Sequence, residues 1–237
     1  MTDEHFEREL QIFRKETDEA AQCFHAYLAV HKKAGRTRVR DFLNRTPLFW
    51  KTCLAALQTA SFIALARIFD EDSPHNLNSI IRLAQNNVGI FSKESHARRK
   101  RKDVKPPQSF SEFLQDVYEP TSADFKHIRA LIKEPRKIYQ TKYADLRHGW
   151  FAHEGLSERE AALLFADTDI REFQGLLAFL GSMSEAFWQL FFNGTKPSVQ
   201  RYSPGAGSRV GTLITIEAER FLMSAAKVRQ RRRAKSK

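Results

Sequence analysis

The chain has 237 residues, of which 42% are hydrophobic, and a formal net charge of +11 at pH 7. This length and composition allow a globular protein with one large or two small domains and a real hydrophobic core. The only two cysteines, Cys23 and Cys53, lack CxxC spacing, which argues against a disulfide-stabilised scaffold or a zinc site. The excess positive charge favours acidic partners, with nucleic acid first and an anionic membrane surface second.

No targeting segment is visible in the sequence. Residues 1–7 are acidic and lack the basic start and apolar run of a signal peptide. The longest uncharged run, residues 52–66, has fifteen residues, whereas a membrane span needs about twenty. We therefore expect no transmembrane segment, a buried bundle helix over 52–66, and a location in the reducing cytoplasm.

Two long helices are predicted in the first third of the chain. Apolar side chains recur at three- and four-residue steps over residues 4–33, as in an amphipathic helix. Residues 35–40 combine a glycine with a basic run and predict a turn. A second helix is predicted from Thr46 to Phe69, with Pro47 in its first turn. Few of its positions are polar, so we expect it at the centre of a bundle.

A strongly basic segment follows this second helix. Pro74 ends the helix, and Asp72 or Ser73 is expected to cap a short helix around residues 77–84. The segment from about 93 to 107 has no apolar face and predicts a solvated or disordered insertion. Its cations form a candidate RNA-binding tract of Arg98, Arg99, Lys100, Arg101 and Lys102.

Short helices are predicted in the middle of the chain. One spans about residues 110–118, and another begins after a cap at Thr121 or Ser122. Pro135 either kinks that helix or starts its successor. The apolar stripe that follows consists of Ile138 or Tyr139, Tyr143, Leu146 and Trp150.

A second strongly apolar helix is predicted from Ile170 to about residue 192, capped by Thr168-Asp169 and stopped at Asn193-Gly194. After a glycine-containing loop, residues 212–228 predict a last helix, although its first turn also has strand propensity. The tail from residue 227 is expected to be frayed. It carries the second candidate RNA-binding tract, Arg231, Arg232 and Arg233.

These elements predict an all-α bundle with long antiparallel helices and short peripheral helices. Residues 1–200 would form the bundle, and residues 201–237 would add a loop, a C-terminal helix and a basic tail.

Reactive groups concentrate in residues 143–154, which hold an arginine, two histidines, a glycine and three aromatic side chains. Arg147 and His153 are six positions apart, or roughly 240° around an uninterrupted α-helix, so they would not share a face. Gly149 offers a solution, because a left-handed glycine can end the helix and let the chain fold back.

Such groups suit RNA cleavage without a metal. An imidazole can accept the 2′-hydroxyl proton or protonate the leaving 5′-oxygen. A guanidinium can stabilise the negative charge that develops on the phosphate. One histidine cannot be acid and base at the same instant, so the second proton carrier is either a histidine of a second copy in a symmetric dimer or His148 of the same chain.

The sequence Arg147-His148-Gly149-Trp150-Phe151-Ala152-His153 resembles the motif of HEPN domains, in which an arginine and a polar residue precede a histidine and four to six residues separate Arg from His. The segment from residues 48–51 through residues 64–70 also resembles the helix of the abortive-infection subgroup of these domains. The resemblance covers about residues 5–192.

This resemblance implies a helical bundle, a homodimer, no cofactor, and the metal-independent endoribonuclease activity of toxins and phage-defence proteins. Arg147 and His153 would be its catalytic pair and RNA its substrate, and a cognate antitoxin is a further expected partner. His148 stands at the polar position, where many members carry asparagine, and could replace or perturb the expected role.

Simpler interpretations stay open. Arg147 and His153 also fit a helix-terminal cation and a capping histidine. Trp150 and Phe151 fit core side chains better than a surface for stacking bases. The two basic tracts are equally well interpreted as solvated.

Metal and nucleotide sites are poorly supported. His148, His153 and Glu154 lack HExxH spacing. Residues 205–211 are glycine-rich but lack a preceding strand and the GK[ST] ending of a phosphate loop. Two other functions remain as alternatives: a non-catalytic HEPN-like module that binds RNA or a protein, and a membrane-surface protein that uses its basic tail.

Overall fold

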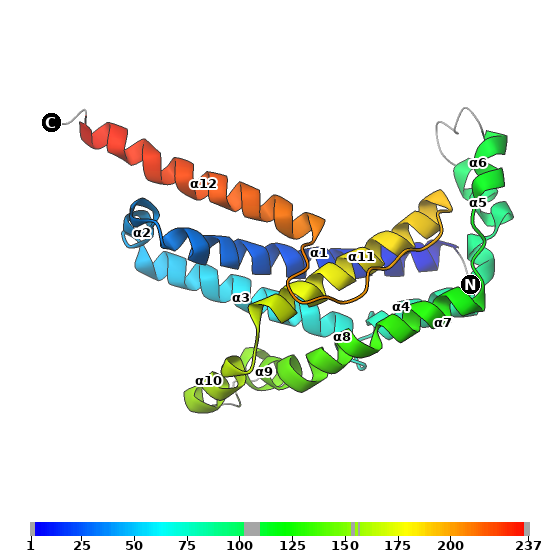
Figure 1. Ribbon diagram of the computed structural model, residues 1–237, viewed down its shortest axis with the longest axis horizontal. Helices are drawn as coiled ribbons and strands as arrows, with labels where there is room; N and C mark the ends of the chain where they lie inside the picture. The colour runs from blue at the N-terminus through cyan, green and yellow to red at the C-terminus, as the bar shows by residue number, and fades with distance from the viewer. Residues whose placement is uncertain (1–2, 102–109, 153–154, 156, 235–237) are drawn as a thin grey trace.

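The computed structural model describes residues 3–101, 110–152, 155 and 157–234 (Figure 1). In this part of the chain all regular structure is helical, which confirms the all-α class. The helices are α1 (Asp3–Ala34), α2 (Thr37–Leu43), α3 (Pro47–Phe69), α4 (Leu77–Asn86), η1 (Val88–Phe91), α5 (Lys93–Arg101), α6 (Phe110–Asp116), α7 (Ser122–Leu131), α8 (Lys133–Ile138), η2 (Tyr139–Tyr143), α9 (Ala144–Leu146), η3 (Arg147–Ala152), α10 (Glu158–Ala166), α11 (Ile170–Asn193) and α12 (Arg209–Ala234).

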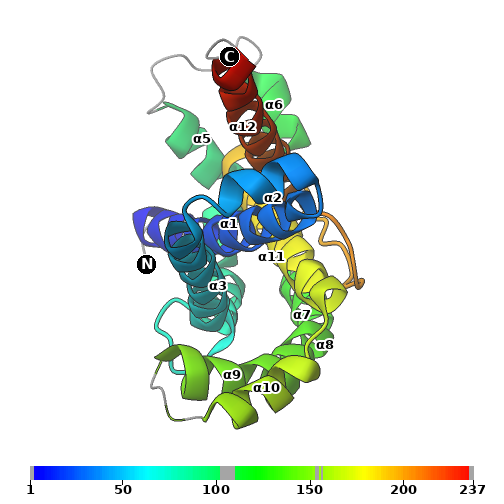
Figure 2. The same ribbon diagram turned by 90° about the vertical axis from the view of Figure 1, so that its left-hand side faces the viewer.

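Helix α1 lies at the centre of the molecule and packs against α3, α11 and α12 (Figures 1 and 2). Its residues Phe6, Leu10 and Phe13 are at most 1% exposed. The ring of Phe6 lies 5.2 Å from that of Phe91 and 5.1 Å from that of Phe191, measured between centroids. Aromatic pairs at this spacing are favourable beyond their buried area, so the rings fix how η1 and α11 sit on α1.

The predicted turn at 35–40 is present only at residues 35 and 36, because residues 37–43 form the short helix α2. Val39 and Leu43 are four positions apart, and both are buried. They form a small second cluster with Val30 of α1 and Leu222 of α12. Burial of two aliphatic side chains on one helical face therefore stabilises a helix in a segment whose sequence is dominated by arginines.

Residues 93–101 form helix α5, so the predicted solvated or disordered insertion was wrong over these residues. Residues 102–107 of that insertion lie outside the described part of the chain. The ring of His96 is 1% exposed and lies 6.2 Å from the ring of Phe113. The sequence of α5 shows no apolar stripe because the residues on its buried face are of polar types. Long charged side chains can nevertheless cover apolar surface with their aliphatic stems.

Capping residues set several helix ends. Thr121 caps α7 and Asp169 caps α11, as predicted. Helix α4 is capped by Asn76, so the expected cap at Asp72 or Ser73 was wrong.

Helix α3 has the predicted bounds, but only its C-terminal half lies in the core. Its buried residues fall between Ser61 and Phe69, whereas Leu48 and Phe49 are 77% and 60% exposed. By length and composition alone, α3 and α11 could each cross a membrane; 67% of the apolar window of α11 is buried within the protein, against 39% of that of α3. The expectation that all of α3 occupies the bundle centre was therefore wrong.

Helix α12 packs against α1 and α2 after a long loop. Gly194, with φ of 64°, ends α11 as predicted. Gly211 allows the close approach of α12 to α1, because a Cβ atom there would overlap the ring of His25. Since α12 continues to Ala234, the predicted fraying from residue 227 was wrong up to that point, and the strand propensity of its first turn is not realised.

Burial of His96 predicts a pH-dependent stability. Burial, and then the nearby charges of Arg99 and Lys100, lower the pKa of His96 from 6.5 to about 4. Below pH 6.5 the unfolded chain therefore binds a proton that the folded chain excludes, so stability falls between pH 6.5 and pH 4. Between pH 7 and pH 5 this histidine should lower the unfolding free energy by about 2 kcal/mol.

Urea unfolding of wild type and His96→Leu at both pH values measures this effect. The variant should lose less stability than wild type on acidification. His127→Leu, which removes an exposed histidine of α7, is the matched control. Equal acid sensitivity of wild type and His96→Leu would contradict the prediction.

Candidate functional site

Residues 139–152 continue directly from α8 as a run of wide turns. The segments η2 and η3 have π-type hydrogen bonding, and the three residues of α9 separate them. Gly149 belongs to η3 and does not take a positive φ, so the predicted left-handed break at this residue was wrong. Single π turns within helices are uncommon and frequently occur at functional sites.

Two tyrosines fix this run to the bundle. The hydroxyl of Tyr139 donates to Oδ1 of Asp70 at 2.8 Å, and the hydroxyl of Tyr143 donates to the backbone oxygen of Asp169 at 3.2 Å. Burial, followed by the charge of Asp70, raises the pKa of Tyr139 well above its usual value. The hydroxyl thus remains protonated and can act as a permanent donor to the carboxylate.

The aromatic residues after Arg147 divide between core and surface. Phe151 packs against Phe62 of α3 with 4.5 Å between ring centroids. Trp150 is 36% exposed, so the expectation that it is a core side chain was wrong. Widened turns shift the register of the helix, which accounts for Trp150 leaving the face that Tyr139, Tyr143 and Leu146 bury.

Arg147 is held by a carboxylate at the end of α3. Its Nη2 atom lies 3.3 Å from Oδ2 of Asp70, and the two side chains are 25% and 17% exposed. Asp70 pairs with Arg147 through Oδ2 and accepts a hydrogen bond from Tyr139 through Oδ1, so one carboxylate joins α3 to both η2 and η3. The Nε atom of Arg147 is buried and has no hydrogen-bond partner among the described residues.

His148 lies next to the guanidinium. Its Nδ1 atom is 2.8 Å from Nη1 of Arg147. Its Nε2 atom is 3.4 Å from the same Nη1 atom, so the guanidinium lies close to both ring nitrogens. The structure thus brings together two of the three predicted catalytic residues, a fixed cation and an adjacent imidazole.

His153, the third predicted catalytic residue, lies outside the described part of the chain, as does Glu154. Asp145, the other carboxylate near the motif, is exposed. Among the described side chains, no three His, Cys, Asp or Glu residues are grouped as metal ligands would be.

The model of the HEPN_AbiU2 family, described as AbiU2, matches residues 3–205 of the 237. The chain belongs to the HEPN_AbiU2 family. This is an HEPN-type, abortive-infection-associated family, which confirms the resemblance that the motif at 147–153 indicated. No curated protein and no solved structure matches the chain. The matched residues include α1, α3, the π run and α11, and end before α12.

In this HEPN_AbiU2 protein the first basic tract is partly committed to the fold. Arg99 donates to the backbone oxygens of Ile90 and Phe191 at 2.7 and 2.9 Å, and its guanidinium lies 4.2 Å above the ring of Phe191. It also pairs with Asp3 at 3.3 Å. Its side chain is 15% exposed, so little of this cation faces solvent.

The other cations of the tract differ in their exposure. Arg98 is 59% exposed and pairs with Asp3 at 2.8 Å. Arg101 is exposed, Lys100 is half-buried, and Lys102 lies outside the described residues. Arg98 and Arg101 are therefore the members of the tract that the structure presents most openly to solvent.

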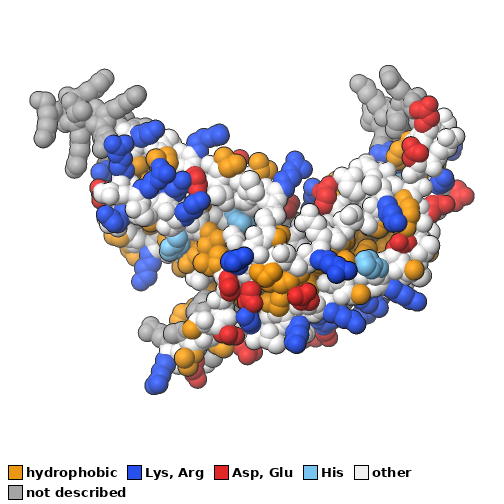
Figure 3. Space-filling model, viewed as in Figure 1, with side chains coloured by type: hydrophobic (Ala, Val, Ile, Leu, Met, Phe, Trp, Pro, Cys, Tyr) orange, Lys and Arg blue, Asp and Glu red, His pale blue; other side chains and the backbone are white. Residues whose placement is uncertain are grey.

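The two basic tracts lie far from the motif. Figures 1 and 2 show α5 and α12 on one side of α1, and α9 with α10 on the other. The backbone of Arg231, Arg232 and Arg233 lies in the last turns of α12, and their side chains lie outside the described part. Lys and Arg side chains are spread along the whole face seen in Figure 3 and do not gather at one place. An RNA that reached both tracts and the motif would have to wrap around the molecule.

Two residues of this arrangement, Asp70 and Tyr139, were not among the sequence-predicted site residues. The predicted helix stops one residue before Asp70, and Tyr139 is predicted only as a possible member of an apolar stripe. The available signal was weak: Asp70 ends the segment 48–70 that resembles the family helix, and the stripe leads to the motif. Nothing in their spacing from Arg147 shows that the three side chains meet.

Removing Asp70 or its hydrogen-bond partner Tyr139 should have graded effects on stability. Asp70→Ala leaves the Tyr139 hydroxyl and the guanidinium without their shared acceptor, and should lower the unfolding free energy by about 3 kcal/mol. Tyr139→Phe removes only one hydrogen bond and should lower it by about 1 kcal/mol. Urea denaturation measures both, with the exposed Asp41→Ala of α2 as control. Equal losses of stability in Asp70→Ala and Asp41→Ala would contradict the role of Asp70 in holding Arg147 and Tyr139.

Arg98 and Arg99 should differ sharply although they are neighbours. Arg99→Ala removes two charge-assisted hydrogen bonds and the contact with Phe191, and should destabilise the fold by about 3 kcal/mol. Arg98→Ala removes a largely exposed ion pair and should change stability by less than about 1 kcal/mol. Thermal or urea unfolding of both variants distinguishes them, and a similar loss in each would show that Arg99 does not anchor α5.

Proposed function

We propose that this protein is a metal-independent endoribonuclease of abortive-infection defence, with Arg147, His148 and His153 as its reactive groups. The observation that carries the proposal is the contact between Arg147 and His148 at 2.8 Å, with Arg147 anchored on Asp70. Membership of an abortive-infection-associated HEPN family supports the same reading.

The chemistry requires a proton acceptor, a proton donor and a fixed positive charge. One neutral imidazole accepts the proton of a ribose 2′-hydroxyl, whose oxygen attacks the adjacent phosphorus. The bond from phosphorus to the 5′-oxygen breaks, and a protonated imidazole delivers a proton to that oxygen. The products are a 2′,3′-cyclic phosphate and a 5′-hydroxyl.

Arg147 would stabilise the phosphate as negative charge increases on its oxygens. A guanidinium has five N–H donors, so the contacts with Asp70 and His148 leave donors for a phosphate. Because Asp70 already fixes its position, little reorganisation is needed when charge develops, which is the condition for strong electrostatic stabilisation.

The partners in this proposal are RNA as substrate, a second copy of the chain, and a cognate antitoxin, with action in the cytoplasm. Arg98, Lys100, Arg101, Lys102 and the cations at Arg231, Arg232 and Arg233 would contact the RNA backbone. Such contacts with phosphates release counterions, so binding should weaken steeply as salt increases.

The ion pair with Asp70 also favours a second function. An arginine paired with a carboxylate at a helix end is a structural cation, and a protein built this way could be a non-catalytic module that binds RNA or a protein. Affinity would then depend on the basic tracts and be indifferent to His153.

Cleavage of total RNA and transfer RNA in EDTA distinguishes the two functions. Wild type should give fragments that end in 2′,3′-cyclic phosphate. His153→Ala should reduce the cleavage rate by about 100-fold or more, because general acid–base catalysis contributes about 10²–10⁴-fold. His127→Ala, at an exposed histidine of α7, is the control and should cut like wild type.

Intact RNA in every lane at low salt, from protein shown to be folded by circular dichroism, would support the binding module. Equal cutting by wild type and His153→Ala would reject the motif as the reactive site.

A further inference from the structure

A cavity between α4 and the consecutive helices α7 and α8 is strongly basic. Helices α4 and α7 pack side by side (Figure 1). The cavity has a volume of about 530 Å³. Among the described side chains, four cations and one carboxylate line it: Arg82, Arg129, Lys133, Arg136 and Glu71. This excess of positive charge favours an anionic ligand.

Three of the four cations form one stripe. Arg129, Lys133 and Arg136 follow one another at steps of four and three positions, so they share a helical face. The stripe crosses from α7 to α8 because Ile132, which joins these helices, keeps a right-handed helical conformation. Arg82 lines the cavity from α4. Cations on two helices can therefore contact one phosphate chain from two sides.

The wall formed by α4 adds polar groups to this charge. The first turn of α4 contributes Asn78 and Ser79 to the lining. Asn76 caps the turn, and its amide donates to the backbone oxygens of Glu71 and Ser73 at 2.9 and 2.6 Å. The turn is thus fixed to the segment that follows α3. A wall that is already ordered loses little entropy when a ligand binds.

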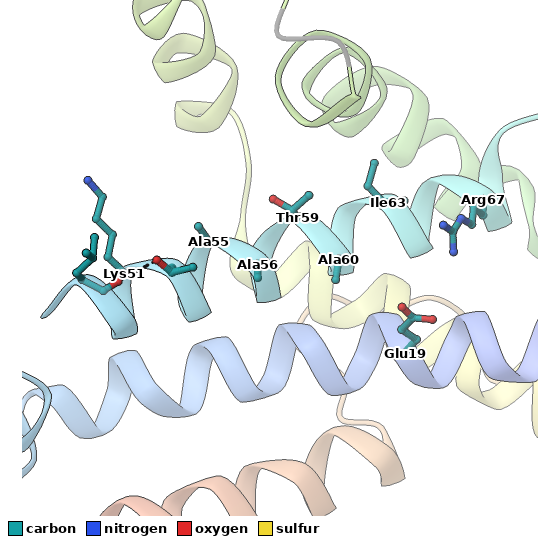
Figure 4. A pocket seen from close by; sticks show the side chains of 10 residues that line it. Glu19, Lys51, Ala55, Ala56, Thr59, Ala60, Ile63 and Arg67 are labelled. Atoms are coloured by element: carbon teal, nitrogen blue, oxygen red, sulfur yellow. Dashed lines mark hydrogen bonds between the residues drawn. The ribbon is translucent and has the colours of Figure 1, made fainter. Parts of the chain in front are cut away.

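Two other cavities have different linings. The groove along α3 is lined mainly by small and apolar side chains, with charged groups at its margins (Figure 4). In the cavity between α1 and α11 two cations are offset by two carboxylates, Arg14 and Arg209 against Asp18 and Glu185. Neither holds more than two cations among the described side chains. The cavity at α4 is therefore much better suited to phosphate than these two.

Two consecutive carboxylates join this cavity to the motif. Glu71 pairs with Arg136 in the wall of the cavity. Asp70, the preceding residue, binds Tyr139 and Arg147. Along the helical run, Arg136 and Arg147 are about 16 Å apart at the rise of an α-helix. A few nucleotides of extended strand can span this distance.

We propose that this cavity is a phosphate-binding subsite, which holds the backbone of an RNA strand a few nucleotides from the phosphate beside Arg147. The assignment of RNA rests on the proposed function, whereas the preference for phosphate follows from the cations of the cavity. Because phosphates carry no sequence information, the subsite positions the strand and does not select bases. Arg82, Arg129 and Lys133 are therefore positioning residues.

The subsite gives an RNA strand a direct path to the motif. Helices α5 and α12, which carry the two basic tracts, lie on the other side of α1 from α9 and α10 (Figures 1 and 2). In contrast, α8 continues directly into the run that holds Arg147. A strand in the cavity reaches the motif along this run and need not wrap around the molecule.

Binding of an RNA that cannot be cleaved tests the subsite separately from catalysis. A labelled strand of about twelve nucleotides with 2′-O-methyl riboses has no free 2′-hydroxyl, and fluorescence anisotropy measures its affinity for the full-length protein. Arg129→Ala with Lys133→Ala should weaken binding by about 10-fold or more at low salt. The slope of log affinity against log salt should become shallower by roughly 1.4, since each phosphate contact on a single strand contributes about 0.7.

Arg38→Ala with Arg40→Ala is the matched control. It removes the same charge from exposed positions of α2, at the opposite end of the molecule from α4 (Figure 1). Affinity should stay within about twofold of wild type, and the salt slope should not change. Arg129→Lys with Lys133→Arg keeps both charges and should restore most of the binding. Both side chains are exposed, so every variant should keep the circular dichroism spectrum of wild type.

Inorganic phosphate distinguishes an RNA strand from a small phosphate ligand. The melting temperatures of wild type and of Arg129→Ala with Lys133→Ala are measured in phosphate and in chloride of equal ionic strength. Selective stabilisation of wild type by phosphate, together with equal RNA affinity in both proteins, would assign the cavity to a small phosphate ligand. That result would overturn the RNA subsite.

Cleavage assays show which proposal fails. Arg129→Ala with Lys133→Ala should raise KM by about tenfold and keep kcat within about twofold, because it removes binding and leaves the reacting groups in place. Cleavage by wild type with an unchanged KM and affinity in this variant would overturn the subsite and leave the nuclease standing. Binding that the variant weakens, without any cleavage, would reject the nuclease and retain the subsite. A wild type that does not bind the uncleavable strand at low salt would overturn the subsite.

Discussion

The structure depends on the requirement that α1 bury apolar side chains against several helices at once. Helix α1 has 32 residues and contacts α3, α11 and α12. Its phenylalanines meet rings from η1 and α11, while Phe24 stacks on Phe173 at 4.3 Å. The remaining helices must pack around this axis, and those with less apolar surface, such as α5 and α6, lie at the periphery (Figure 1).

The candidate site is a second consequence of this packing. The buried C-terminal half of α3 ends at Asp70, where an apolar helix gives way to a carboxylate. The π run ends beside it, so Arg147 and Tyr139 converge on the same group. A cation held in this way is suited to a phosphate and equally to a purely structural role. Its position is the same in both cases, so the difference lies in whether histidines next to it exchange protons with a substrate.

Helices α3 and α11 show why composition alone does not assign a place in the fold. The sequence predicts both as central helices, yet most of α11 is buried within the protein and the N-terminal half of α3 is not. The cause lies in the neighbours that each helix meets. Helix α11 begins directly after Asp169, whose backbone oxygen accepts a hydrogen bond from Tyr143, and it packs against α1. The N-terminal half of α3, before Ser61, rests on α1 with its opposite face uncovered.

The sequence by itself determined the helical class, the long helices, the caps at Thr121 and Asp169, and the motif that places the chain in its family. These features depend on residues within a few positions of one another, where helical periodicity and capping chemistry act. Only the tertiary structure decided that Arg99 and His96 face inward and that Asp70 holds Arg147. It also decided that the helix continues through Gly149 in π turns. Those outcomes depend on contacts between segments distant in the chain, and no local pattern of charge or hydrophobicity encodes which of them will meet.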